Sequence, residues 1–280
     1  MIKINNKSTP ALTSVFNKNI CPKSKRSQTT IFIIIGIILV SILGLFFLLG
    51  GKGVIDIAKA KEINPNIFLQ SCIEDKVHEG IDLISRQGGY IKNPLNKTFR
   101  FTGEIDYTDI SYLCYTVNYY LSCVNQEPML ITHLKDEVEK YIFDEVDNCF
   151  NDLVYSLEKE NYIVDADYNG FEVGLEPGRV VVEIDAGLDL TKSDESLSID
   201  DFKLIIPSKF YDLAIVVQEI ISQEARFCHF EHLGFMALYH DYDIDRFRTS
   251  DLITIYTLKH RQSEEMFRFA VRACVIPPGF

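Results

Sequence analysis

The spacing of apolar residues predicts three amphipathic helices in this chain. In residues 67–87 apolar side chains recur every three or four positions, and a Gly-Gly pair ends the repeat. The same spacing appears in residues 130–157 and in residues 210–227, where Ser208 can cap the helix start. Each of these stretches therefore predicts a helix with one apolar face.

Strands are predicted in the segments around these helices, where apolar residues alternate with polar ones and turn-forming residues separate the runs. The turns are Asn169-Gly170, Pro177-Gly178 and 193–196. The predicted strands are 98–108, 111–120, 162–167, 171–175, 179–190, 197–206, 252–258 and 266–275. The fold class that follows is α+β, as a domain at 65–280 with three main helices packed on an antiparallel sheet.

A different pattern fills residues 31–51, which contain no charged side chain. As a helix, residues 31–49 would be about 28 Å long, close to the ~30 Å hydrocarbon core of a bilayer. A cleaved secretory signal has a shorter apolar run, and a buried core helix of a soluble domain keeps a polar face. We therefore expect an N-terminal transmembrane helix at 31–51, followed by a juxtamembrane segment at 52–64.

Charge is divided unevenly along the chain. Residues 1–30 hold six basic and no acidic side chains, so the other 22 basic and all 40 acidic ones give the remainder a net charge of −18. Basic residues flank the cytoplasmic end of membrane helices. We expect a cytoplasmic tail at 1–30 and an acidic domain outside the cell membrane, with the bilayer as one partner and no nucleic-acid partner.

The junction KRSQTTIFIIIG, at residues 25–36, resembles the class III, type IV pilin-like signal peptide of archaeal surface proteins. In that family cleavage precedes the apolar run and the helix is retained. The resemblance implies a cut between Ser27 and Gln28 and a pilin-like assembly. A basic stop at the membrane edge would explain the same residues without processing.

A second resemblance lies in SCIEDKVHEGIDLISRQGGYI, at residues 71–91. This segment is similar to an element of uncharacterised archaeal membrane-anchored proteins, in which a signal-anchor precedes a Cys-bearing helix and an acidic ectodomain. That group carries no assigned activity, so the resemblance implies a location and no chemistry.

Six of the seven cysteines fall in the predicted outer domain, and Cys21 lies in the tail. An even number of extracytoplasmic cysteines indicates disulfides. Cys72 and Cys149 lie on or near the apolar stripes of two predicted helices, which can pack and bring them to bridging distance. Cys114 and Cys123 are close in sequence. The favoured pairs are Cys72–Cys149, Cys114–Cys123 and Cys228–Cys274. Buried free thiols are the alternative.

Two clusters contain residue types that bind metals. His229 and His232 are three residues apart, as on one face of a helix. Asp241, Asp243 and Asp245 alternate as in the first half of a calcium loop, but its sixth position is Arg and its twelfth is Leu. Ordinary surface histidines and a solvated acidic edge explain both clusters, so we expect no metal and no cofactor.

Other candidates are less specific. Asn96 begins a glycosylation sequon, which is meaningful only outside the cytoplasm. Carboxylates at 185, 189, 194 and 195 could in principle serve glycoside chemistry, and tyrosines at 112, 115, 119 and 120 could form a binding platform. Many other acidic residues could be named in place of these carboxylates, so they indicate no site. For the tyrosines, core and sheet packing is the favoured explanation.

No nucleophile, phosphate-loop or dinucleotide motif occurs in the sequence. We therefore expect a single-pass surface protein, and not an enzyme, with a structural or interaction role and with protein partners or self-assembly. A ligand-binding or sensor ectodomain is the alternative, and an extracytoplasmic hydrolase is a third hypothesis.

Overall fold

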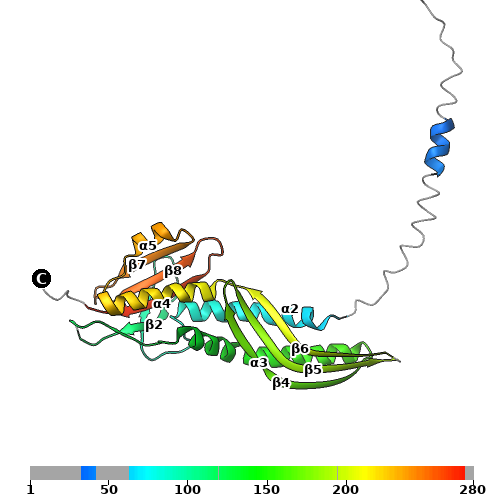
Figure 1. Ribbon diagram of the computed structural model, residues 1–280, viewed down its shortest axis with the longest axis horizontal. Helices are drawn as coiled ribbons and strands as arrows, with labels where there is room; N and C mark the ends of the chain where they lie inside the picture. Colours follow the sequence, from blue (N-terminus) through cyan, green and yellow to red (C-terminus); the bar gives the residue numbers. More distant parts are fainter. Residues whose placement is uncertain (1–32, 42–62, 119, 194, 275–280) are drawn as a thin grey trace, which may run out of the picture. The chain divides into compact units, whose positions relative to one another are not determined.

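The computed structural model describes residues 33–41, 63–118, 120–193 and 195–274 (Figure 1). The chain divides into two units, Met1–Glu62 and Ile63–Phe280. In the first unit residues 33–41 are helical, and their side chains are exposed. Across the described part of the chain, no helix combines the length and apolar character needed to cross a membrane.

Several predictions fall on residues outside this description. The tail at 1–30, with Ser27, Gln28 and Cys21, is among them, as are residues 52–62 of the juxtamembrane segment. Of the predicted membrane helix at 31–51, only residues 33–41 are described.

The second unit is a mixture of helices and strands. Its helices are α2 (Pro65–Arg86), α3 (Leu130–Lys159), α4 (Phe210–Phe227) and α5 (His232–Leu238). Its strands are β1 (Asn96–Phe99), β2 (Thr108–Tyr115), β3 (Val124–Asn125), β4 (Ile163–Glu176), β5 (Arg179–Lys192), β6 (Glu195–Pro207), β7 (Tyr242–Arg248), β8 (Thr254–His260) and β9 (Met266–Arg272). The α+β fold class predicted from the sequence is present in this unit.

Helix α2 begins at a sequence-encoded cap. The side chain of Asn64 accepts hydrogen bonds from the backbone N–H groups of Asn66 and Ile67, at 3.1 and 3.3 Å, and Pro65 occupies the first turn. The apolar stripe of the helix is buried, and α3 packs along it. The two helices approach closely at Gly80, where an added Cβ would lie 2.6 Å from Cδ1 of Tyr141.

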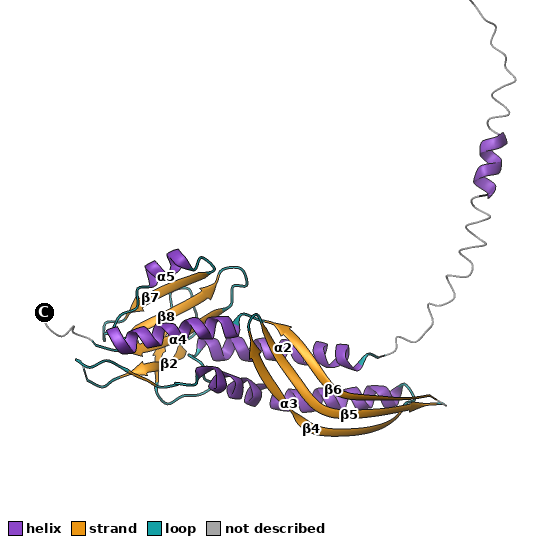
Figure 2. Cartoon of the chain, in the orientation of Figure 1, coloured by secondary structure: helices purple, strands orange, loops and turns teal. Residues whose placement is uncertain are grey.

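The first sheet consists of β4, β5 and β6 in antiparallel order (Figure 2). Every second residue of β5 from Val180 to Leu190 is buried, so one face of the sheet is apolar. Helix α3 packs against β4, and α2 against β6. The opposite face carries exposed acidic side chains, among them Glu183, Asp185 and Asp189.

In this sheet, the prediction of two strands at 162–167 and 171–175 is wrong, because both belong to the continuous strand β4. The pair Asn169-Gly170, expected to form a turn, lies at a register shift between Tyr168 and Gly170. Gly170 has φ 116°, a conformation that other residues rarely adopt. Strand β5 pairs with β4 on both sides of this shift, so β4 continues as one strand with a local irregularity instead of ending in a turn.

The second sheet has the order β1-β2-β9-β8-β7, with β3 paired to β2. Strand β9 runs parallel to β2, with Tyr115 opposite Arg272, and antiparallel to β8. The sequence predicts a single antiparallel sheet, whereas the described residues form two sheets with one parallel pair of strands. Hairpin signals report only on neighbours in sequence, and this parallel pair joins distant segments.

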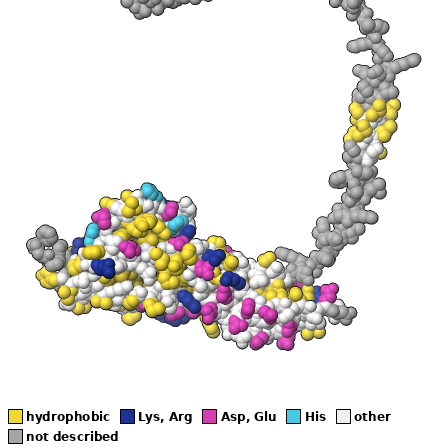
Figure 3. All heavy atoms as spheres, in the orientation of Figure 1, with side chains coloured by type: hydrophobic (Ala, Val, Ile, Leu, Met, Phe, Trp, Pro, Cys, Tyr) yellow, Lys and Arg dark blue, Asp and Glu magenta, His cyan; other side chains and the backbone are white. Residues whose placement is uncertain are grey.

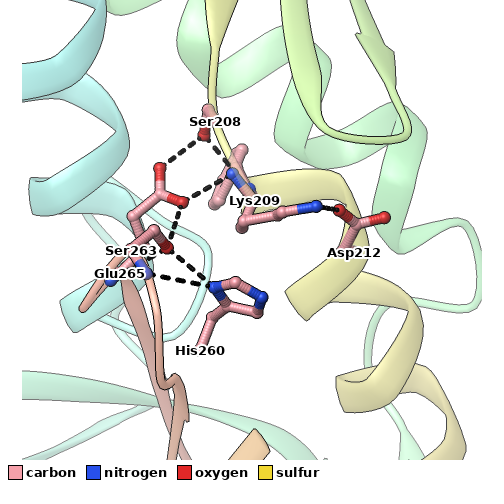
Figure 4. A network of polar contacts seen from close by, with 7 residues as sticks. Ser208, Lys209, Asp212, His260, Ser263 and Glu265 are labelled. Carbon is pink, nitrogen blue, oxygen red and sulfur yellow. Dashed lines mark hydrogen bonds and ion pairs between the residues drawn. The ribbon is translucent and has the colours of Figure 1, made fainter. Parts of the chain in front are cut away.

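A carboxylate from the β8–β9 turn holds the start of α4 (Figure 4). Glu265 accepts hydrogen bonds from the hydroxyl of Ser208 at 2.8 Å and from the backbone N–H of Lys209 at 2.6 Å. The Ser208 hydroxyl in turn accepts from the N–H of Phe210 at 3.1 Å. The N-cap of α4 is Lys209, one residue after the Ser208 that the sequence predicts. The Ser208 hydroxyl still bonds the first turn, and Glu265 is a second group that the local sequence does not reveal.

Candidate binding groove

A groove with a volume of about 890 Å³ lies between α4 on one side and α5 with the start of β7 on the other. Its α4 wall extends from Tyr211 to Gln223. At ~1.5 Å per residue, that wall is about 18 Å long. Figure 3 shows hydrophobic side chains gathered over this part of the molecule, and Asp and Glu side chains gathered over the β4–β6 sheet.

The groove has an apolar interior. Val216 and Phe230 are almost completely buried at 7% and 1% exposure and form its inner surface. Ile215 on α4, Leu238 at the end of α5 and Tyr239 directly after it line the groove while remaining exposed, with 78% of Leu238 accessible. Large apolar side chains that stay accessible along one groove indicate a binding surface.

Helix α5 forms the outer wall and is held to the edge of the second sheet. The N–H of Ile244 donates to the sulfur of Met236 at 3.1 Å, and the N–H of Tyr242 donates to the carbonyl of Tyr239 at 3.3 Å. None of the seven residues of α5 is buried. The helix therefore covers part of β7, and its half-buried Phe235 and Met236 pack against the core.

Two contacts fix α4 and the turn that follows it. The disulfide Cys228–Cys274 joins the end of α4 to the residues after β9. Glu224 of α4 and Tyr256 of β8 are both buried, and the Tyr256 hydroxyl donates to the Glu224 carboxylate. The inner wall of the groove is thus connected to the sheet by one covalent bond and one buried hydrogen bond.

The charged residues that line the groove are all acidic: Asp212, Glu219 and Glu231. Lys209 binds Asp212 at 3.1 Å, and His229 binds Glu231 at 3.4 Å and lowers the pKa of that carboxyl. The groove thus offers an apolar interior beside negative charge. Such a surface binds by burial and charge attraction, and its described lining lacks a nucleophile beside a general base.

The metal-binding candidates from the sequence are not brought together. Among the described residues, the one group of three metal-ligating side chains close to each other is Cys72, Glu145 and Cys149, and its two sulfurs form a disulfide. His229 contacts Glu231, and one nitrogen of His232, Nδ1, is buried without a partner.

The edge strand β7 contains Asp243 and Asp245, and Asp241 directly precedes it, so the three acids lie along a strand and not in a calcium-type loop. Ile244 between them points into the core, and the side chains of Asp243 and Asp245 are exposed. Arg261 lies 3.8 Å from the carboxylate of Asp243. The alternation of acids follows from the two-residue period of the strand.

Three disulfides join Cys72 to Cys149, Cys114 to Cys123 and Cys228 to Cys274. These are the three pairs that the sequence favours. The first connects α2 to α3 across their packed faces, as the apolar stripes indicate.

The other candidates lie at separate places. Asn96 begins β1, and its side chain donates to the carbonyl of Asn93 at 2.6 Å. Asp185 and Asp189 lie on the acidic face of β5, and Glu195 begins β6. The ring centroids of Tyr112 and Tyr115 are 5.1 Å apart, but Tyr112 is buried and Tyr115 accepts a hydrogen bond from Arg272 at 3.2 Å. Tyr120 is exposed, so the described tyrosines do not form an exposed platform together. Asp194 and Tyr119 are outside the described residues.

Sequence reasoning missed the groove because α5 and β7 were not predicted. In residues 228–245 the sequence indicates two clusters of metal-binding residue types and one disulfide cysteine, but no helix or strand. A signal was present: Phe230, Phe235, Leu238 and Tyr239 recur near helical spacing after α4, although the stretch is too short for that spacing to be decisive.

Comparison of the chain with protein-family models, with curated proteins and with solved structures finds no significant match.

Proposed function

We propose that this chain is a single-pass, membrane-anchored surface protein whose domain outside the membrane binds a protein partner through the α4–α5 groove. The observation that supports it most directly is an open apolar groove in a domain with three disulfides. Disulfides persist in extracytoplasmic compartments, and exposed apolar grooves mark interaction sites.

The anchor in this proposal is the uncharged stretch at 31–51, and the basic tail at 1–30 sets its orientation. Pilin-like assembly after a cut between Ser27 and Gln28 is the narrower form of the proposal. A pilin stalk needs one long helix, whereas α2 starts at its own cap, Asn64. We therefore place the interaction in the globular domain and not in a helical stalk.

The location is tested with a membrane-impermeant maleimide on intact cells. We expect Cys21 to react only after the membrane is permeabilised, and the six other cysteines to react only after reduction. Labelling of Cys21 in intact cells, or of Cys72 and Cys149 without reduction, would contradict the proposed orientation. The mass of the mature N-terminus tests processing, since a start at Gln28 supports assembly and an intact Met1 excludes it.

The interaction is tested by placing a photo-crosslinking amino acid at Leu238 in the groove and, as a matched control, at Leu197 on β6. Both leucines are well exposed, at 78% and 57%. We expect a discrete crosslinked product in intact cells from position 238 and none from position 197. The same products from both positions, or none from position 238, would rule the groove out as the interaction site.

A further inference from the structure

We infer that the α4–α5 groove binds a protein segment that places a lysine or arginine side chain among apolar residues. This inference rests on the proposed function and adds the chemistry of the partner. Its support is the combination of aromatic faces and carboxylates on the same groove.

The carboxylates leave negative charge available for a partner. Asp212 and Glu231 have Lys209 and His229 beside them. Glu219, in the middle of the α4 wall, accepts a hydrogen bond from the neutral amide of Gln223 at 2.6 Å, and no described Lys or Arg forms an ion pair with it. A cation that enters the groove therefore meets a carboxylate that is not already neutralised.

The aromatic rings offer a second kind of attraction for a cation. The ring centroids of Phe235 and Tyr239 are 4.5 Å apart, and those of Phe235 and Tyr242 are 6.4 Å apart. Tyr239 is 54% exposed, so its ring is accessible from the groove. A Lys or Arg head group is attracted to the faces of such rings.

The negative potential extends to these rings. Burial raises the pKa of the Tyr242 hydroxyl, and the carboxylates of Asp212 and Asp241 raise it further. Asp212 belongs to α4 and Tyr242 to β7, so charge from one wall acts on the aromatic group of the other. Anionic ligands are disfavoured here for the same reason.

Size and charge favour a protein segment over other occupants. The apolar side chains of Ile215 and Leu238 accompany the charged groups along a wall about 18 Å long, which suits a helix or an extended segment. A second copy of this chain would bring another strongly acidic domain, because the part after residue 30 has a net charge of −18. Anionic lipid surfaces are repelled in the same way.

The test uses the full chain in dodecyl maltoside micelles and three fluorescein-labelled peptides with identical leucines. The peptides carry two lysines, two glutamines or two glutamates at the same positions, and empty micelles serve as the blank. Fluorescence anisotropy should show the lysine peptide binding about tenfold more tightly than the glutamine peptide. The glutamate peptide should bind most weakly, and added salt should reduce the preference for lysine.

Variants locate the effect. Glu219→Gln should weaken the lysine peptide about two- to fivefold and leave the glutamine peptide unchanged. Asp189→Asn removes the same charge from the acidic face of β5 and should change neither affinity. Equal effects of the two variants would overturn the inference, because the preference would then come from the overall charge of the domain.

The outcomes also separate this inference from the proposed function. If all three peptides bind equally and Leu238→Ser weakens each of them, the groove is a docking site and the cation inference is wrong. If no peptide binds, or if Leu238→Ser has no effect on binding, the assignment of the groove fails as well.

Discussion

The hydroxyl of Tyr256 donates a hydrogen bond to the carboxylate of Glu224 inside the core of the second unit. Tyr256 is completely buried and Glu224 is 2% exposed. Burial and the neighbouring carboxylate both raise the pKa of Tyr256, which keeps the hydroxyl protonated as a donor. The contact links α4 to β8, so it supports the groove wall from beneath.

Removal of the Tyr256 hydroxyl should therefore destabilise the folded domain. We expect Tyr256→Phe to lower the free energy of unfolding by about 1–3 kcal/mol, because the buried carboxylate loses its partner. Tyr155→Phe is the matched control, since Tyr155 is 58% exposed, and its effect should stay within ~0.5 kcal/mol. Urea denaturation measures both, and equal effects would show that the contact contributes little.

The disulfides should differ in their contributions. Replacing both Cys72 and Cys149 by Ser should cost about 4 kcal/mol, whereas the same change at Cys114 and Cys123 should cost about 3 kcal/mol. The reason is that the first bridge closes a loop with a sequence separation of 77 and the second one of 9. Guanidinium unfolding of the two double variants tests the order, and the reverse order would contradict the loop-entropy explanation.

Gly80 should tolerate no side chain. An alanine there would gain up to ~1 kcal/mol of helix propensity, but its Cβ would meet the ring of Tyr141. We expect a net loss of about 1–2 kcal/mol from overpacking between α2 and α3. At Gly234 in α5 the nearest atom is 3.4 Å away, so Gly234→Ala should not destabilise the fold. Thermal unfolding of both variants compares the two glycines.

Part of the stability lost on acidification should come from Asp251. Hydrogen bonds from Lys97 and Thr249 lower the pKa of its carboxyl from 3.8 to about 2. The unfolded chain then binds the proton more tightly, so this stabilisation is complete above pH ~4 and is lost as the pH falls towards 2. Because the Asp251 side chain is 49% exposed, its contribution is about 1 kcal/mol.

The measurement is the free energy of unfolding between pH 5 and 2 for the native chain, for Asp251→Asn and for Asp189→Asn. The first variant should be less stable at pH 5 and should lose less stability towards pH 2. The second should follow the native curve. A native curve that Asp251→Asn leaves unchanged would show that the Lys97 ion pair is not maintained in solution.

Local patterns in the sequence account for the long helices. The apolar spacing at 130–157 and 210–227 predicts α3 and α4 within two residues, because one buried face determines where such helices begin and end. The same faces place Cys72 and Cys149 opposite each other. The spacing of apolar residues within each helix is local information, and it is sufficient to predict that α2 and α3 pack together through these faces.

The candidate groove depends on information that is not local. Its walls come from α4, α5 and β7, and α5 has seven residues with none buried, too few for a clear period. The roles of Glu265 at the start of α4 and of Tyr256 beside Glu224 are also set by segments far away in sequence. Such contacts follow from topology, and the hairpin signals did not reveal the parallel β2–β9 pair.

The central position of β9 has a consequence for biosynthesis. Strand β9 follows all other described strands along the chain, yet it lies between β2 and β8. Tyr115 and Arg272, which bond across the parallel pair, are 157 residues apart. Strands β2 and β8 therefore each keep an unpaired edge until β9 has been synthesised. Because of this late, long-range pairing, folding of the sheet should be slow and dependent on protection by chaperones.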